Sequence, residues 1–479
     1  MFFEVLRNWV VNWLLNNLSC RQILTGLSLG SFSSQDLVEE YLRRIEDGKV
    51  FNAVAFLDPS AVRESALEAD KRRATGDRSP LLGLPLSVKD SIAVKGWPWR
   101  SGSFAREDVI AQNDATTVAR LREAGAIFLC KTTTPEYTWS VETESALHGI
   151  TRNPYDLDRT SGGSSGGEAV LHAIGASPAG LGSDGLNSIR VPAHFCGTTG
   201  LRPSTGVVPE TGVWPTTRET GLMDTSTIGP MAKFADDLDL LLDFIVGPDG
   251  LDPFTHPLGT VGRRPLKGLK VGYWRSHPVA PADLEIQNAV ESAANRLDQA
   301  GSIVTEMIPF PIEDSVEIAF SIMAPDGGEL VRKDVAAAKG RHSPSFAVLI
   351  EQLRNQELTM SQYLSAVSRW KAVRAAIRTQ MSNFDIVLAP VAAHSAPKHL
   401  SSLAEGDVGL DVSAYTYSFA IALAGLPSVS LPIKITNTGL PVGIQIMSSP
   451  HSDRVAVGVA AALQEEMGLI RGPLDEERR

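Results

Sequence analysis

The sequence predicts an α/β fold in which α-helices flank a mixed central β-sheet, and three observations carry this prediction. Amphipathic helical patterns alternate along the 479 residues with short apolar runs of strand length. A unit of helix, glycine and strand occurs twice, at 114–130 and at 284–304. The composition, with 43% hydrophobic and 21% charged residues, is that of a globular protein long enough to bury a large core.

The first element with a clear pattern is a helix expected at 34–47. Ser33 or Ser34 can cap its start, and Gly48 ends it. Its apolar residues recur at helical spacing, so that they form one buried stripe. The stripe consists of Leu37, Val38, Tyr41, Leu42 and Ile45.

The two repeated units come next. In the first, Asp114 is expected to cap a helix that ends at Gly125 and leads into a strand at 127–130. In the second, a helix at 284–300 leads into a strand at 303–304. Both units are typical of layered α/β proteins.

The rest of the chain supplies more strands and their cover. Residues 310–374 have helical patterns and no strand pattern, so we interpret them as a helical cover over the sheet. Residues 247–267 are rich in Pro and Gly and would connect two halves of a single domain that spans 19–479. A closing helix is expected at 453–466. Further strands are expected at 269–273, 386–389, 429–433 and 442–447.

Residues 1–18 form an apolar N-terminal extension rich in Phe, Trp, Val and Leu. Glu4 and Arg7 interrupt it, and it is shorter than the about 20 residues that a membrane span needs. We expect an amphipathic helix that docks on the domain or on a partner subunit. The alternative is a shallow anchor at a membrane surface.

Charge and cysteine content narrow the class of protein. A formal charge of −11 argues against nucleic acid as a partner, because phosphate binding needs a basic surface. Cys20, Cys130 and Cys196 are too few and too scattered for a disulfide framework or a zinc site. We therefore expect a cytoplasmic protein without a membrane partner, and a homodimer is compatible with the sequence.

Two serines and one lysine are the candidate chemical groups. Ser164 lies in the glycine-rich run 161–168, Ser188 follows 24 positions later, and Lys89 stands beside Asp90 at the end of an apolar run. A hydroxyl is a weak nucleophile until a nearby base takes its proton. A relay of two serines and a lysine would supply that base without histidine or metal, which indicates a hydrolase.

Known glycine-rich and serine–lysine motifs of different chemistry fit the chain less well. Residues 162–166 satisfy G-x-S-x-G, but that nucleophile elbow must follow a buried strand, and 151–160 is polar and broken by Pro154. No dinucleotide-binding or P-loop pattern is present. The S-x-x-K match at 395–398 contains Pro397, which disfavours the helix that this motif needs.

Taken together, these segments resemble the amidase signature family, serine hydrolases that use a Ser–cis-Ser–Lys triad. The resemblance covers nearly the whole chain from about Cys20, and the serine spacing matches the family. The matching segments are GLPLSVKD (83–90), KTTTPEY (131–137), TRNP (151–154), GGSSGGE (162–168), SIRVPAHFCG (188–197), GLRP (200–203), IGPM (228–231) and GLPVGIQ (439–445).

The resemblance implies a role for each of these residues. Ser188 would be the nucleophile, Ser164 after a cis Gly–Ser bond the proton relay, and Lys89 the base. A lysine is a base at neutral pH only when burial lowers its pKa. The backbone N–H groups of Gly185, Leu186, Asn187 and Ser188 would form the oxyanion hole, and Ser165, Asp184 and Arg190 would hold the loops, with Arg190 paired to Asp184. No metal or organic cofactor is implied.

The chain departs from the family in two places. Family members usually carry Thr-Gly-Gly or a similar run before the nucleophile, where this chain has Leu186 and Asn187 after Gly185. Leu186 could narrow the acyl pocket, while Asn tolerates the turn geometry better than most residues. The Asn that commonly follows Lys-Thr is Thr133 here.

The resemblance implies an amidase that acts on a small carboxylic amide, with esters and carbamates as further substrates. We expect a largely uncharged substrate, because aromatic residues near the motifs could line a cleft, although core packing is the default for each of them. One rival is the glutaminase-type subunit of a glutamyl-tRNA amidotransferase, and the other is a catalytically silent binding homologue. The candidate aromatic residues are Trp97, Trp99, Tyr137, Trp139 and Trp214.

Overall fold

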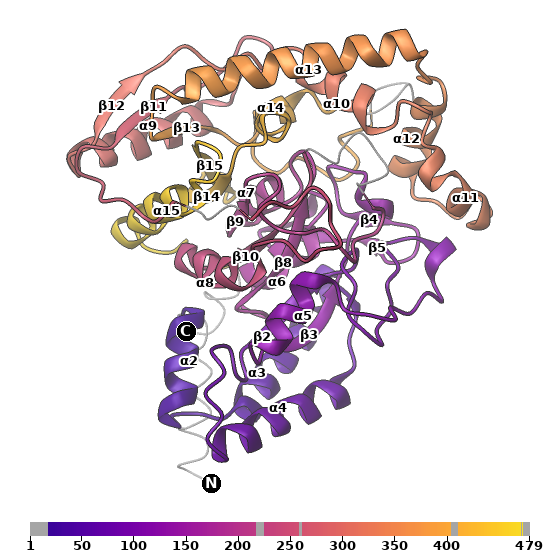
Figure 1. The fold of residues 1–479 in the computed structure, drawn as a ribbon, viewed down its shortest axis with the longest axis vertical. Coiled ribbons are helices and arrows are strands. Elements are labelled where there is room, and N and C mark those ends of the chain that lie inside the picture. Colours follow the sequence, from indigo (N-terminus) through magenta and orange to yellow (C-terminus); the bar gives the residue numbers. More distant parts are fainter. Residues whose placement is uncertain (1–17, 217–224, 258–260, 404–410, 471, 473–479) are drawn as a thin grey trace.

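The computed structural model describes residues 18–216, 225–257, 261–403, 411–470 and 472, so all but the last residue of the expected extension at 1–18 lies outside the described residues. An 11-stranded sheet runs through the molecule (Figure 1). Its strands lie in the order β1 (Val54–Phe56), β3 (Ile127–Thr132), β2 (Pro85–Lys89), β8 (Ala179–Asp184), β10 (Thr227–Ala232), β9 (Thr199–Arg202), β14 (Ser428–Ile435), β15 (Pro441–Ser448), β13 (Ile386–Pro390), β11 (Lys270–Tyr273) and β12 (Ile303–Glu306).

The sheet is mixed, as predicted. Strand β2 runs parallel to β3 and β8, and β11 runs parallel to β12 and β13, whereas the strands at the centre are antiparallel. The two halves of the chain meet where β9 pairs with β14, which joins Leu201 to Val429. Strands from both sides of the helical segment 310–374 therefore share one sheet.

Helices cover this sheet. Helix α7 contacts β9, β14 and β15, while α8, α9 and α15 contact one another or the same central strands. The described helices are α2 (Cys20–Leu29), α3 (Ser34–Asp47), α4 (Pro59–Ala74), α5 (Thr116–Glu123), α6 (Gly166–Ala173), α7 (Arg190–Cys196), α8 (Ala235–Ile245), α9 (Leu284–Gln299), α10 (Ser315–Met323), α11 (Glu329–Ala337), α12 (Pro344–Arg354), α13 (Met360–Met381), α14 (Thr416–Ala424) and α15 (Asp453–Met467).

The segment 310–374 is helical and contains no strand, as predicted. Its helices α10 to α13 lie at one end of the molecule, with the long α13 beside α10 and α14 at the top of Figure 1. Within the described ranges, no helix combines the length and the apolar character needed to cross a lipid bilayer.

Most sequence-predicted elements are confirmed within two residues of their ends. The helix at 34–47 is α3, and the strands at 269–273, 386–389, 429–433 and 442–447 correspond to β11, β13, β14 and β15. The Ser33 hydroxyl accepts the N–H of Asp36 and so caps α3.

The predicted cap at Asp114 is wrong. Helix α5 starts at Thr116 behind Ala115, and no side chain caps it. The Asp114 carboxylate instead accepts the N–H of Lys95 at 2.7 Å and pairs with Arg122 at 2.7 Å. The carboxylate accepts hydrogen bonds from these two donors and makes none to the first N–H groups of α5.

Two short ribbons lie between β3 and α6 in the sequence. They pair β4 (Glu144–Ser145) with β5 (Gly149–Ile150) and β6 (Arg152–Asn153) with β7 (Asp156–Thr160).

The parallel strands β2 and β8 end at the same edge of the main sheet, because parallel strands present their carboxyl ends together. Lys89 and Asp184 are the last residues of these two strands.

Replacement of Ile444 by Ala tests the packing of the sheet. Ile444 is fully buried in β15, where it pairs with Leu431 and Pro390. We expect Ile444→Ala to lower the free energy of unfolding by about 2–5 kcal/mol, as measured by urea denaturation. The matched change Ile308→Ala, at a side chain that is 81% exposed, should cost less than about 0.5 kcal/mol. Similar losses for the two variants would contradict the described core.

Candidate active site

The amine of Lys89 lies at the end of β2, fully buried among hydroxyl groups. It donates to Ser164 Oγ at 2.6 Å, to Ser165 Oγ at 2.9 Å and to Ser183 Oγ at 3.0 Å, and it lies 3.4 Å from the Ser183 carbonyl oxygen. The lysine and the first serine of the predicted set therefore meet within hydrogen-bond distance.

Ser164 reaches this position because of the glycine before it. The Gly163–Ser164 peptide bond is cis, as the family resemblance implies. A Cβ at position 163 would lie 2.7 Å from the backbone nitrogen of Glu142, closer than real Cβ contacts allow. Only glycine fits at position 163, and the tight turn then leads directly into α6.

The environment of Lys89 favours its neutral form. Burial lowers the pKa of Lys89 to about 7, against the opposing effect of the charges of Asp184 and Glu168. Among the hydrogen bonds of the described residues, neither carboxylate bonds to the amine. Glu168 instead accepts from the hydroxyls of Ser87 at 2.6 Å and Thr132 at 2.8 Å. A neutral lysine beside Ser164 Oγ can accept a proton near neutral pH.

Asp184 pairs with Arg190, as expected from the sequence. Both side chains are fully buried, and the guanidinium donates to the two carboxylate oxygens at 3.0 and 3.1 Å. The same carboxylate accepts the backbone N–H of Ile189 at 3.1 Å. Arg190 and Arg202 lower the pKa of Asp184, so the carboxylate stays charged. This ion pair fixes the turn that carries Ser188.

The turn at 185–188 directs its N–H groups away from Arg190. Arg190 donates to the Leu186 carbonyl at 2.6 Å, and in a trans peptide the next N–H, that of Asn187, points the opposite way. The Asn187 carbonyl accepts the N–H of Val191 at 2.9 Å, which orients the N–H of Ser188 in the same manner. Within the described part of the chain, none of the four N–H groups from Gly185 to Ser188 donates a hydrogen bond to protein.

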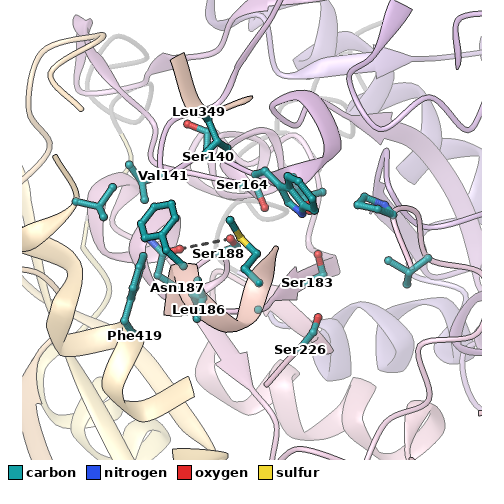
Figure 2. Close-up of a pocket in the computed structure, with 18 residues that line it drawn as sticks. Ser140, Val141, Ser164, Ser183, Leu186, Asn187, Ser188, Ser226, Leu349 and Phe419 are labelled. Atoms are coloured by element: carbon teal, nitrogen blue, oxygen red, sulfur yellow. Dashed lines mark hydrogen bonds between the residues drawn. The ribbon is translucent and has the colours of Figure 1, made fainter. Parts of the chain in front are cut away.

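Ser188 lies beside the Ser164 turn. Its carbonyl accepts the backbone N–H of Ser165 at 3.1 Å, and its hydroxyl donates to Asn187 Oδ1 at 3.5 Å. Figure 2 shows Ser164 and Ser188 next to each other at the wall of one cavity. Ser164, Ser188 and the turn with the unused N–H groups thus line one cavity, and the buried Lys89 amine contacts Ser164 without lining the cavity itself.

The cavity contains about 750 Å³ of space free of protein atoms, including its opening to solvent. Its wall is mostly apolar, and none of the described residues that line it carries a charged side chain. The lining residues are Thr138, Trp139, Ser140, Val141, Ser164, Ser183, Gly185, Leu186, Asn187, Ser188, Val213, Pro215, Ser226, Phe320, Met323, Leu349, Val412 and Phe419.

Trp139 is the one member of the predicted aromatic set that lines the cavity. Trp97 packs on the main core beside Phe56 instead. Tyr137 is fully buried, and its hydroxyl shares a 2.7 Å hydrogen bond with Ser103.

Two further tryptophans of the set contact an arginine side chain and do not line the cavity. The Arg106 guanidinium lies over the rings of both Trp99 and Trp214, at 5.0 and 4.5 Å from their centroids. Closeness to a motif in the sequence therefore identified only one aromatic residue of the cavity wall, because the other four side chains contact other groups.

Sequence analysis missed several residues at the site. Ser183 holds the Lys89 amine, and its position directly before Asp184 is the one hint that the sequence offers. Lys131 is a second fully buried lysine, which donates to the carbonyls of Asp90 and Ile92 and so holds the segment after Lys89. The far wall of the cavity comes from Phe320 on α10 and from helices α12 and α14.

Among the described residues, no group of His, Cys, Asp and Glu side chains is arranged to hold a metal ion.

Thr133, at the position where the family commonly has Asn, shares a 2.6 Å hydrogen bond with the Thr151 hydroxyl. Thr151 in turn donates to the Asn52 carbonyl at 2.9 Å, so Thr133 belongs to a buried polar network.

Comparisons with known proteins identify a family and a fold. The family model described as Amidase matches residues 36–456. A glutamyl-tRNA(Gln) amidotransferase subunit from Psychrobacter sp. (strain PRwf-1) is 30% identical, over 94% of this chain and 96% of its own length. A solved amidase structure is 29% identical with a TM-score of 0.81 and covers 94% of this chain and 100% of its own. Fatty acid amide hydrolase, at 21% identity, shares the fold with a TM-score of 0.85 over 96% of this chain and 86% of its own.

Replacement of Asp184 by Asn tests the buried ion pair. The change leaves the Arg190 guanidinium buried without a countercharge, and we expect a loss of about 3–5 kcal/mol in the free energy of unfolding. Urea denaturation would measure it.

Asp156→Asn is the matched control. Asp156 pairs with Arg159 at the same 3.0 Å, but its carboxylate is 42% exposed, so the loss should stay below about 1 kcal/mol. A loss for Asp184→Asn no larger than that of the control would contradict the role of this pair.

Proposed function

The chain belongs to the amidase family, and from this premise we propose that it hydrolyses a small, largely uncharged carboxylic amide through an acyl-enzyme on Ser188. In this proposal Lys89 is the base and Ser164 carries protons between Lys89 and Ser188. Esters and carbamates are further candidate substrates, because they pass through the same kind of tetrahedral intermediate.

In the first step, Ser188 Oγ forms a bond to the substrate carbonyl carbon. Its proton passes to Ser164 Oγ, while the Ser164 proton passes to the neutral amine of Lys89. The 2.6 Å separation of Lys89 Nζ and Ser164 Oγ supports this transfer. The carbonyl π electrons move to the oxygen, which becomes an oxyanion, and the unused N–H groups of 185–188 would bind it.

In the second step, the oxyanion re-forms the carbonyl and the carbon–nitrogen bond breaks. The proton held by Lys89 returns through Ser164 to the leaving nitrogen, which leaves as a neutral amine or ammonia. Water then attacks the ester on Ser188 with the same relay as the base, and this releases the carboxylic acid and restores the serine. A lysine with a pKa near 7 suits both directions of transfer.

The uncharged wall of the cavity is the single observation that carries the substrate class. Apolar side chains such as Leu186, Phe320 and Phe419 surround Ser188, and none of the described lining residues could neutralise a charged substrate group. Moving an unpaired charge into such a wall is costly, whereas an aliphatic or aromatic group gains about 25 cal/mol for each Å² that it buries.

The glutaminase-type subunit of a glutamyl-tRNA amidotransferase is the second candidate function. It is favoured by relatives of that name at 28–30% identity that cover nearly the whole chain. In that case the chain would need partner subunits and a nucleic-acid acceptor. Glutamine carries an ammonium and a carboxylate, which the described lining leaves without counterions, so we place this candidate second. A cytoplasmic location remains a prediction from the sequence.

An amide panel with Ser188→Ala tests the proposal. We expect wild-type protein alone to release amine or ammonia from aliphatic amides or anilides faster than from glutamine. Ser188→Ala should reduce kcat by at least about 10³-fold, because loss of the nucleophile leaves only binding and the oxyanion donors. Ser65→Ala, on the exposed side of α4, serves as a control that should keep activity. Preference for glutamine, or activity only with added partner chains, would favour the second candidate.

The pH dependence tests the role of Lys89. Because the base must be neutral, kcat/KM should rise with pH through about 7 and then level off. Glu168→Gln removes a negative charge that stabilises the ammonium form, so the pKa of Lys89 should fall and the rise should move to lower pH. Asp156→Asn, at the surface, should leave the profile in place. A profile that does not move in Glu168→Gln, or that moves to higher pH, would contradict this assignment.

A further inference from the structure

Asn187 places a carboxamide inside a mostly apolar cavity. Its side chain is only 3% exposed and lines the cavity beside Ser188 (Figure 2). Its Oδ1 accepts the Ser188 hydroxyl at 3.5 Å, which is long for a hydrogen bond between two oxygens. Its Nδ2 is buried and has no partner among the described residues.

A buried N–H without a partner is unusual, because the group has lost water and gained nothing in return. Backbone N–H groups such as those of 185–188 are present whichever residues form the turn, whereas the side-chain donor is present only because position 187 is Asn. The unpartnered Nδ2 therefore needs an explanation within this site. A ligand atom that arrives during the reaction would supply its missing acceptor.

The position of the carboxamide identifies that ligand atom. Asn187 Oδ1 is already in contact with Ser188 Oγ. When Oγ bonds to the substrate carbon, the oxyanion is attached to the same carbon as Oγ. A carboxamide that contacts Oγ is thus within reach of the oxyanion, and side-chain amides are among the donors that stabilise such oxyanions.

We propose that the Asn187 side-chain amide donates a hydrogen bond to the oxyanion and so adds a side-chain donor to the backbone N–H groups of 185–188. Before substrate binds, its Oδ1 holds the Ser188 hydroxyl. As the Ser188 proton leaves for Ser164, this weak contact ends and the amide N–H meets the developing negative charge. The inference rests on the proposed function, since it requires Ser188 to be the nucleophile.

The test compares a probe that forms the oxyanion with one that does not. An alkyl trifluoromethyl ketone adds to a catalytic serine and generates a tetrahedral oxyanion, whereas the matching alkyl methyl ketone binds mainly as an intact carbonyl. Inhibition constants for both, with kcat and KM for the best amide of the panel, would be measured for wild type, Asn187→Leu and Asn187→Ser. Leu has a similar shape without a donor, and Ser retains a short donor.

We expect Asn187→Leu to weaken inhibition by the trifluoromethyl ketone and to lower kcat, each by about 10²–10³-fold. Inhibition by the methyl ketone and the KM should change by less than about threefold. Asn187→Ser should recover part of the loss, which a purely structural role would not predict. Equal weakening of both ketones, or a rise in KM at constant kcat, would overturn the inference in favour of substrate recognition in the ground state.

Labelling with a fluorophosphonate separates this inference from the proposed function. The wild type should be labelled at Ser188, and Ser188→Ala should not be labelled. If the wild type is not labelled, the nucleophile assignment fails and the role of Asn187 fails with it. If the wild type is labelled and Asn187→Leu matches it in kcat and in both inhibition constants, only the role of Asn187 is refuted. Thermal unfolding of each variant would show that it is folded, and Asn187→Ser provides the smaller change.

Discussion

The burial of one amine constrains the rest of the site. Lys89 has no solvent exposure, so its ammonium form would have to be stabilised by protein groups alone. Three hydroxyls surround the amine and can bind either of its protonation states. The two carboxylates whose charges raise the pKa of Lys89 bind other partners. Asp184 is held by Arg190, and Glu168 by Ser87 and Thr132. A direct carboxylate partner would fix the proton on the lysine and leave Ser164 without an acceptor.

The proposed reacting groups and much of the cavity wall come from different parts of the chain. Lys89 ends strand β2, and Ser164 and Ser188 lie in the turns just before α6 and α7, all in the first half of the chain. Much of the apolar wall comes from α10, α12 and α14 of the second half. If the proposed function holds, substitutions in these helices would alter substrate preference without moving Lys89, Ser164 and Ser188, in keeping with the general separation of scaffold and binding surface.

Local patterns in the sequence predicted much of the fold and singled out the three residues that we propose as the reacting groups. The stripe from Leu37 to Ile45 determines α3, and the ordered motifs located Lys89, Ser164 and Ser188. Strands β8 and β10 were missed because glycines, and in β10 also Pro230, interrupt their apolar pattern. A Cβ at Gly180 would lie 2.2 Å from Glu168 Oε2, and one at Gly229 would lie 2.0 Å from the Leu201 carbonyl oxygen. Close packing by distant segments selects glycine there, which weakens the strand pattern. The cavity wall could not be predicted, since it depends on contacts between residues hundreds of positions apart.

The pairing of β9 with β14 has a consequence for synthesis of the chain. Strand β9 ends at Arg202, but its partner begins at Ser428, so a ribosome must add more than two hundred residues before the sheet can close at its centre. At usual translation rates this interval is on the order of 10 to 50 s. During that time the nascent first half presents an open strand edge of the kind that promotes aggregation. A chaperone that shields this edge, or slow release of the chain, would raise the yield of folded protein, and truncation before β14 would leave the edge open permanently.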